Sequence, residues 1–476
     1  MKRLTMLGAA LALVLPQTGV QAAQVPAAAS QSVGQIAFRE LYRELVETDT
    51  SAATGDCSAL ALNVAGRFRK AGFAESQITL FRDKAYQLDG GVVVIVPGLS
   101  TMTKPMLLLG HLDVSNANPR HWKTDPYKLV EQDGVYYGRG TADMKALDAI
   151  WIDTLLRFKT EGFKPRRTIK LALTCGHETS SHTNGAEWLA QHRPELLQAE
   201  FALTEGGGGL TDGHGKLTSQ SFAVGEMTMA NYEVETFSAG GPSAIPNYDN
   251  AISRMIDALV KVRAYRFPLH LNVTSRRYFA QAGAARGDAM GAAMMRLAAD
   301  PKDSAAEALV SSDLFYNPML RTTCLTTLVQ GGYLVTAIPQ TAKATINCYI
   351  LPGETAEETR EALYNAIGDP KIVMTRVGRA APTPLAPVHE AHILRPAEQL
   401  VASHYPGIQL VPSISLLSTD GAYLAPLGIP TYGVPGLYTD PGGNEIHGHD
   451  EHMAVKSLMT AREFLYDLVK VYAAQE

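Results

Sequence analysis

The 476-residue chain exceeds the length of about 250–300 residues at which a single hydrophobic core stops growing, so two domains are expected. Apolar residues make up 46% of the chain and charged residues 19%, which is typical of a globular protein. The formal net charge of -5 lacks the basic excess of most nucleic-acid-binding proteins and gives no attraction to an anionic membrane surface. We therefore expect no nucleic-acid partner.

The first 22 residues have the pattern of a secretory signal peptide. Lys2 and Arg3 give a positive start, residues 7–15 form a short apolar core, and residues 20–22 offer a small-residue cleavage site. The apolar run is shorter than the ~20 residues of a membrane span. We expect an exported protein, periplasmic or secreted, with no membrane span after cleavage. The alternative is a cytoplasmic protein with a frayed apolar start.

The next region alternates helix and strand patterns. Apolar residues at helical spacing and short apolar runs bounded by Gly and Pro predict helices at 34–47, 57–71 and 143–160 and strands at 91–97, 106–109, 168–174 and 199–204. This βαβ rhythm predicts an α/β fold, with a mostly parallel sheet and helices on both faces.

From about residue 218 the order changes to β–α–β–β–α–β, which predicts an α+β ferredoxin-like sandwich. An Ala-rich helical insertion at 282–310 interrupts it. Past Pro382 the chain is expected to rejoin the first domain and to end in a helix at 455–473. We therefore divide the chain into a signal peptide (1–22), a first α/β segment (30–217), an inserted domain (218–382) and a second α/β segment (383–476).

The four cysteines are too few for a disulfide scaffold. Cys324 and Cys348 both fall in strand-like segments, and an oxidising compartment would permit them to pair. The alternative is that the cysteines are buried small apolar groups.

Histidines and carboxylates follow the ends of several predicted strands, where open α/β sheets place their sites. These residues are His111, Asp113, Asp143, His177, Glu178, Glu205 and, far downstream, His447. Such donors suit zinc, cobalt or manganese. Each motif alone has an ordinary explanation, such as a surface pair, a helix cap, a turn residue or a solvated loop. Their order and context together predict a metal site.

The surrounding segments carry a longer pattern, made up of Gly110-His111-Leu112-Asp113-Val114, Trp122, Asp125-Pro126, the run from Tyr137 to Lys145, Gly185-Ala186, Glu205-Gly206, and His447 with Glu451. This order resembles the aminoacylase, carboxypeptidase G and succinyl-diaminopimelate desuccinylase family of dinuclear zinc hydrolases, over nearly the whole mature chain. The resemblance implies a zinc-peptidase-like catalytic domain with an inserted lid domain, through which we expect a homodimer. It also implies hydrolysis of small peptides or N-acyl amino acids.

Transferred residue by residue, the resemblance implies two divalent metal ions. Zinc is expected, with cobalt or manganese as alternatives. Asp143 would bridge the two ions, and the other ligands would be His111 with Glu205 at one ion and Glu178 with His447 at the second. Asp113 would hold the His111 ring in the correct tautomer.

The family's general base is the first glutamate of a Glu-Glu pair. When the preceding strand is aligned without gaps, this position is His177 and Glu178 is the metal ligand. A one-residue slip would make Glu178 the base and put Thr179 at the ligand position. The end of the strand favours the first alignment. In either alignment one carboxylate is missing.

Three lid positions also depart from the family pattern. The histidine that stabilises the oxyanion is Pro242, an asparagine is Thr336, and the arginine that helps to bind a substrate carboxylate is Tyr349. Two functions remain open: a working metallohydrolase with His177 as its base, or a catalytically impaired relative that binds metal. A further alternative is that His177 is a metal ligand and not the base. A purely structural role is not expected, because clustered carboxylates repel one another unless a cation lies among them.

Overall fold

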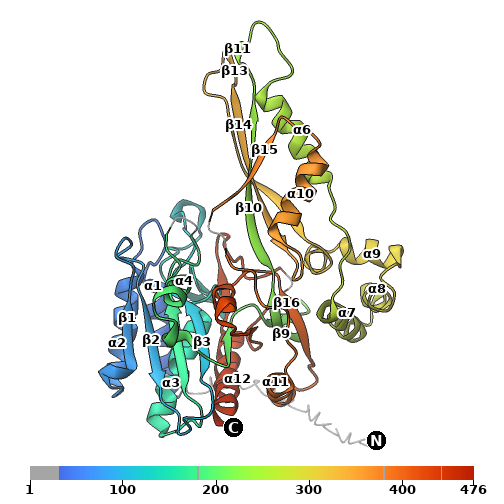
Figure 1. The fold of residues 1–476 in the computed structure, drawn as a ribbon. Coiled ribbons are helices and arrows are strands. Elements are labelled where there is room, and N and C mark those ends of the chain that lie inside the picture. Colours follow the sequence, from blue (N-terminus) through green and yellow to red (C-terminus); the bar gives the residue numbers. More distant parts are fainter. Residues whose placement is uncertain (1–31, 180–181, 379–380, 441, 476) are drawn as a thin grey trace, which may run out of the picture.

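The computed structural model describes residues 32–179, 182–378, 381–440 and 442–475. The signal peptide expected at residues 1–22 lies outside these ranges. The described chain forms a large α/β part and a narrower arm that projects from it (Figure 1). Within these ranges, none of the helices combines the length and apolar character needed to span a bilayer.

The large part is built on a mixed, mostly parallel sheet. Its strands are β1 (Ile78–Phe81), β2 (Gly91–Val96), β3 (Met106–His111), β6 (Ile169–Thr174), β7 (Phe201–Thr204), β8 (Gly208–Thr211), β9 (Leu217–Glu226), β16 (Leu410–Ser415), β17 (Thr431–Gly433) and β18 (Tyr438–Thr439). The order is β1-β2-β6-β3-β7-β17-β9-β8-β18, with β16 beside β9. The central strands β6, β3, β7 and β17 run parallel. At one edge β2 pairs antiparallel with β6, and β1 pairs antiparallel with β2.

Helices cover both faces of this sheet because its central strands are buried on both sides. In β3, Met106 and Leu108 pack into one apolar cluster, and Leu107 and Leu109 pack into another. The first face carries α1 (Val33–Glu47), α2 (Cys57–Lys70), α3 (Lys145–Glu161), α11 (Ala391–His404) and α12 (Val455–Ala474); the second carries α4 (Gly185–His192), α5 (Pro194–Leu197) and the 3-10 helix η4 (Asp420–Leu427). The predicted α/β class is confirmed.

The arm is a small antiparallel sheet covered by two helices. Its elements are β10 (Thr228–Phe237), α6 (Ala251–Ala264), β12 (Thr323–Gly331), β14 (Thr341–Ile350), α10 (Ala356–Ile367) and β15 (Val373–Val377), in the spatial strand order β12-β14-β10-β15. This chain order and strand order are those of the predicted ferredoxin-like sandwich. A short ribbon of β11 (Gly241–Pro242) and β13 (Ala337–Ile338) lies at the tip of the arm (Figure 1).

The arm begins later in the chain than the sequence predicted. The inserted domain was expected to begin at residue 218, but β9 pairs with β8, β16 and β17 of the large sheet, so the arm begins at β10. The helical insertion forms α7 (Val273–Arg286), α8 (Ala289–Ala299) and α9 (Ser304–Ser311), and α7 packs against β16.

The cysteines form two disulfides. Cys324 and Cys348 lie directly opposite each other in β12 and β14 and are bonded, as the strand pattern allowed. Cys57, in the first turn of α2, is bonded to Cys175, a pairing that the sequence did not indicate. Because Cys175 directly follows β6, this second bond ties α2 to the strand end that carries His177.

Candidate metal centre

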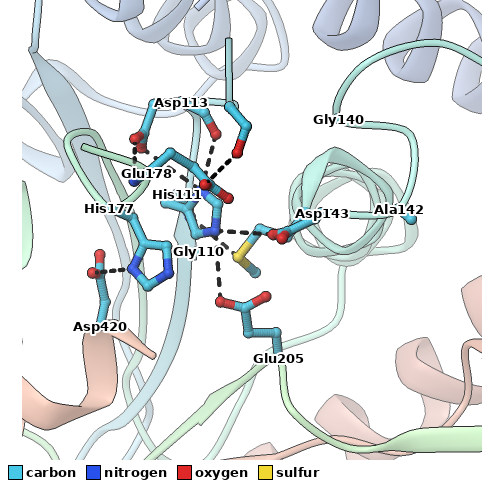
Figure 2. A network of polar contacts seen from close by, with 12 residues as sticks. Gly110, His111, Asp113, Gly140, Ala142, Asp143, His177, Glu178, Glu205 and Asp420 are labelled. Carbon is cyan, nitrogen blue, oxygen red and sulfur yellow. Dashed lines mark hydrogen bonds and ion pairs between the residues drawn. The ribbon is translucent and has the colours of Figure 1, made fainter. Parts of the chain in front are cut away.

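Neighbouring strands of the large sheet bring most of the predicted ligands together. β6, β3 and β7 lie side by side and run in the same direction, so their carboxyl ends meet. His111 is the last residue of β3, Glu205 follows β7, and Glu178 follows β6 after a turn at Gly176, whose φ is 87°. Figure 2 shows these side chains converging with Asp143, which precedes α3.

The last predicted ligand comes from the C-terminal segment. β19 (His452–Ala454) pairs antiparallel with β5 (Val135–Tyr137), which places the loop before β19 beside the turn that precedes α3. His447 lies in this loop with a φ of 61°, a backbone conformation that is uncommon outside glycine. The fold therefore holds the backbone of His447 in an uncommon conformation, which is frequent at functional sites.

The first candidate metal position lies among His111, Asp143 and Glu205. His111 Nε2 is 3.3 Å from Asp143 Oδ1 and 3.5 Å from Glu205 Oε1. Two ligands of one tetrahedral ion with bonds of about 2.0–2.1 Å lie about 3.3–3.4 Å apart, so this spacing fits a shared ion. His111 Nε2 and Asp143 Oδ1 are both buried without a hydrogen-bond partner, and a cation would satisfy both atoms.

The second candidate position faces the other oxygen of Asp143. His447 Nε2 is 3.2 Å from Asp143 Oδ2 and 3.0 Å from Glu178 Oε1. Ser115 Oγ donates a hydrogen bond to Glu178 Oε2 at 2.6 Å and so fixes that carboxylate. One aspartate therefore offers one oxygen to each position, which is the geometry of a bridging ligand. The contact between Glu178 and His447 favours the gap-free alignment over the one-residue slip.

The electrostatics of the cluster favour a bound cation. Burial opposes the charged form of His111, but Asp143 and Glu205 outweigh burial and raise the pKa of His111 well above its usual value. Hydrogen bonds to Asp143 and Glu178 raise the pKa of His447 to about 10. Burial opposes the ionisation of Asp143, yet the two histidines hold its pKa far below the usual range. Without metal, protons supply the positive charge that the carboxylates demand.

Asp113 orients its neighbours in two ways. His111 Nδ1 lies 3.0 Å from the main-chain oxygen of Asp113 and 3.6 Å from its carboxylate, so the carbonyl is the nearer acceptor. The carboxylate accepts a hydrogen bond from the main-chain nitrogen of Glu178 at 2.7 Å. Asp113 thus orients the His111 ring, as the resemblance implied, mainly through its main chain, while its carboxylate fixes Glu178.

Glu451, which the sequence marked only as the end of a motif, joins the two segments of the centre. It is 1% exposed. Its carboxylate accepts hydrogen bonds from the main-chain nitrogens of Gly140, Ala142 and Asp143, at 3.1, 2.8 and 3.0 Å. It also accepts one from Arg139 Nη1 at 2.7 Å. A single buried side chain therefore fixes the turn that presents Asp143 to the loop that presents His447.

His177 is held by a residue that the sequence did not single out. Its Nδ1 lies 2.8 Å from the carboxylate of Asp420, the first residue of η4. Its ring centre is 4.3 Å from that of His111, and the two ring planes differ by 18° (Figure 2). Burial and His111 oppose the charge on His177, but Asp420 outweighs them and raises its pKa to about 9. Asp420 lies 243 residues away along the chain, so no local spacing signals it.

The lid residues divide into two groups. Pro242 pairs with Ala337 in the ribbon at the tip of the arm, and the main-chain oxygen of Thr336 accepts a hydrogen bond from Ser243 there. These positions lie at the far end of the arm from the large part (Figure 1). Tyr349 lies at the other end of β14, where burial and the charges of Glu178 and Asp143 raise its pKa. The structure therefore brings Tyr349 into electrostatic reach of the centre, but not Pro242 or Thr336.

Comparison with known proteins shows the family to which the chain belongs. The model of the peptidase family M20/M25/M40 matches residues 107–471. The chain belongs to this family. This M20 chain is 24% identical over 395 residues to N-fatty-acyl-amino acid synthase/hydrolase PM20D1 of Homo sapiens, covering 79% of this chain and 75% of that protein. It is 24% identical over 391 residues to Aminoacylase-1 of Homo sapiens, covering 79% and 82%. The resemblance drawn from the motifs is confirmed.

Solved structures of the M20 family share the fold. The metallo-carboxypeptidase Sso-CP2 from Sulfolobus solfataricus matches with a TM-score of 0.70 at 15% identity, covering 92% of this chain and 99% of that one. Human carnosine dipeptidase 1 matches with a TM-score of 0.65 at 14% identity, covering 92% and 97%. The YXEP protein of Bacillus subtilis, described as a dinuclear metal binding peptidase, matches with a TM-score of 0.55 at 12% identity, covering 92% and 98%. The family thus includes dinuclear metal-binding members.

Proposed function

We propose that this M20 protein is a dinuclear metal-dependent hydrolase of amide or peptide bonds in small substrates. The observation that carries the proposal is the Asp143 carboxylate, whose two oxygens face two separate ligand sets. Zinc is the expected metal, because imidazole and carboxylate donors at tetrahedral spacing suit it. Cobalt and manganese fit the same donors.

The side chains of the centre have distinct parts in this function. His111 and Glu205 would hold one ion, Glu178 and His447 the other, and Asp143 both. Two such ions supply Lewis-acid polarisation of the substrate carbonyl and a reactive water at neutral pH. Hydrogen bonds with Asp113 and Ser115 hold the His111 ring and the Glu178 carboxylate from behind, so these two ligands would keep their positions as charge develops in the reaction.

The named relatives indicate the class of substrate. PM20D1 is named for N-fatty-acyl amino acids, and one similar structure is a carnosine dipeptidase. We propose N-acyl amino acids and dipeptides for this chain. Tyr349 stands where the family resemblance implies an arginine for the substrate carboxylate. We therefore expect the rate to depend little on a free substrate carboxylate.

Metal content and hydrolysis, measured together, test the proposal. The mature protein is loaded with zinc, and turnover is followed on a panel of dipeptides and N-acyl amino acids. We expect two zinc ions per chain and turnover above about 1 s⁻¹, within the usual range for enzymes. Asp143→Asn should lose both ions and the activity, whereas Asp133→Asn, at an exposed turn, should keep both. A wild-type chain that binds less than one zinc ion contradicts the proposal.

A catalytically impaired relative that binds metal is the second candidate. His177 favours it, because the family position of the general base carries an imidazole rather than a carboxylate. His177→Glu separates the two candidates. A wild-type chain that binds two ions without turnover, beside a variant that gains activity by orders of magnitude, would support the impaired relative.

We also propose that the protein is exported and dimerises through its arm. Two disulfides suit an oxidising compartment. β12 is the edge strand of the arm sheet and exposes Leu325, Leu328 and Val329, which suits pairing with a second copy. Mass spectrometry of the exported chain should show cleavage after Ala22. Light scattering should give a dimer that Leu328→Lys converts to a monomer.

A further inference from the structure

The arm sheet has one face that its two helices do not cover. Side chains alternate between the two faces of a strand. In β14 the even-numbered residues from Ala342 to Ile350 are buried against α6 and α10, whereas the odd-numbered residues are partly or fully exposed. Figure 1 shows both helices on the same side of the arm. Side chains on the other side, which we call the uncovered face, are therefore available to a ligand.

The base of the uncovered face lies against the large part, beside the candidate centre. Tyr349, near the end of β14, packs against an apolar cluster that includes Met227 and Ile414. Ile414 belongs to β16 of the large sheet, so the ring of Tyr349 bridges the arm and the large part. The carboxylates of Glu178 and Asp143, which face the second metal position, lie within electrostatic reach of its phenol. A substrate held at that position would therefore meet the base of the uncovered face.

A pair of amides follows Tyr349 on the same face. Asn347 lies two residues along β14, a distance of about 7 Å, and stands opposite Asn231 of β10. Asn347 Nδ2 donates a hydrogen bond to Asn231 Oδ1 at 2.8 Å, and among the residues that the structure describes neither amide makes another side-chain hydrogen bond. Whichever way the two amides are turned, one NH₂ group and one carbonyl oxygen remain. A donor beside an acceptor matches an amide group, whereas a carboxylate can only accept.

The uncovered face offers no positive charge at its base. The cationic residue that β14 contributes to this face is Lys343, six residues or about 20 Å along the strand from Tyr349. Its ammonium lies 3.1 Å from Glu233 and 3.2 Å from Glu235, so its charge is already matched. Removing a carboxylate from water costs free energy unless a positive partner or several donors compensate for it. The base of the face therefore suits a neutral group better than a carboxylate.

We propose that the base of the uncovered face binds the amine half of the substrate and selects one that ends in a neutral amide. The amides of Asn231 and Asn347 supply one donor and one acceptor, and Tyr349 supplies an apolar wall beside the metal positions. A peptide that continues past this residue, or whose C-terminus is amidated, presents such an amide. The inference rests on the hydrolysis proposed above and narrows its substrates, because a free carboxylate is disfavoured rather than merely unnecessary.

Matched substrates test this preference in the zinc-loaded, full-length mature protein. N-acetylphenylalanine and its N-methylamide differ only in the end group, and their deacetylation is followed by chromatography. We expect kcat/KM to be about 10-fold or more higher for the methylamide, because the site leaves a carboxylate without a partner. Tyr349→Arg should reverse the preference, whereas Thr345→Arg, on the same face opposite Glu233, should keep it. Equal or reversed wild-type values, or an unchanged preference in Tyr349→Arg, overturn the proposal.

Binding of the amine products tests the site without turnover. The metal-free protein is titrated by calorimetry with phenylalanine N-methylamide and with phenylalanine. We expect the methylamide to bind about 10-fold or more tightly, and Asn347→Leu to lose this difference. Equal wild-type affinities, no binding of the methylamide at millimolar concentration, or an unchanged difference in Asn347→Leu overturns the proposal. If the methylamide binds preferentially but the zinc-loaded wild type hydrolyses neither substrate, the hydrolase function fails while the binding site stands.

Discussion

Replacing Glu451 with glutamine should destabilise the large part severely. One carboxylate oxygen of Glu451 accepts from Arg139 Nη1 and the nitrogen of Gly140, and the other accepts from the nitrogens of Ala142 and Asp143. Whichever way the new amide faces, its NH₂ group meets two donors. Arg139, 2% exposed, also loses its counter-charge. Breaking a buried ion pair costs about 3–5 kcal/mol, and we expect a loss of unfolding free energy in that range.

Urea unfolding followed by tryptophan emission measures this loss. The three tryptophans lie at positions 122, 151 and 188, all in the large part, and the Trp122 ring is 5.1 Å from the Arg139 guanidinium. The matched control is Glu445→Gln, an exposed glutamate in the same loop, which should change stability by less than about 0.5 kcal/mol. If Glu451→Gln loses less than about 1 kcal/mol, the pair contributes no more than an exposed ion pair, and the reasoning is refuted.

Four further predictions concern the metals, the pH dependence of stability and a disulfide. His447→Ala should keep one zinc ion per chain and lose the other; retention of both, or loss of both, would contradict the division of ligands. Because the pKa of His447 is raised to about 10 without metal, zinc binding at neutral pH must displace its proton. Zinc affinity should therefore fall as pH falls, and calorimetry in different buffers should show proton release. By the same linkage, the metal-free protein should lose stability as pH rises from about 6.5 to about 10. Replacing both Cys57 and Cys175 with serine should lower the unfolding free energy by about 5 kcal/mol on the chain-entropy estimate for a loop spanning 118 residues. An unchanged urea midpoint would contradict this prediction, because it would show that removing the disulfide gives the unfolded chain no additional conformational entropy.

Several residues of the candidate centre could be predicted from the sequence because each stands next to a strong local pattern. His111 and Glu205 directly end apolar runs that form buried parallel strands, so locating the strand locates the ligand. Asp143 follows a glycine turn at the start of a helix with clear periodicity. The strand predicted before Glu178 also has a strong pattern. Aligning it without gaps put Glu178 at a ligand position, and Glu178 contacts His447 in the structure.

The residues that contact the candidate centre from distant parts of the chain could not be predicted from the sequence, because no local pattern marks them. Asp420 reaches His177 from 243 residues away, and Cys57 reaches Cys175 from 118 residues away. The region between residues 383 and 454 also has little hydrophobic periodicity from which helices or strands could be predicted. Its strands β16 and β17 are short and wholly or largely buried, and its helix α11 contains Pro396, which interrupts helical propensity.

The dependence of the centre on Glu451 and His447 has a consequence for how the molecule is made. Both residues lie near the C-terminus, just before α12, whereas the turn that they complete was synthesised long before. A nascent chain that has reached η4 already holds His111, Asp143 and Glu205 but cannot close the second position. If the centre binds two ions as proposed, a chain that ends before residue 447 would keep the donors of the first position and lack a ligand of the second.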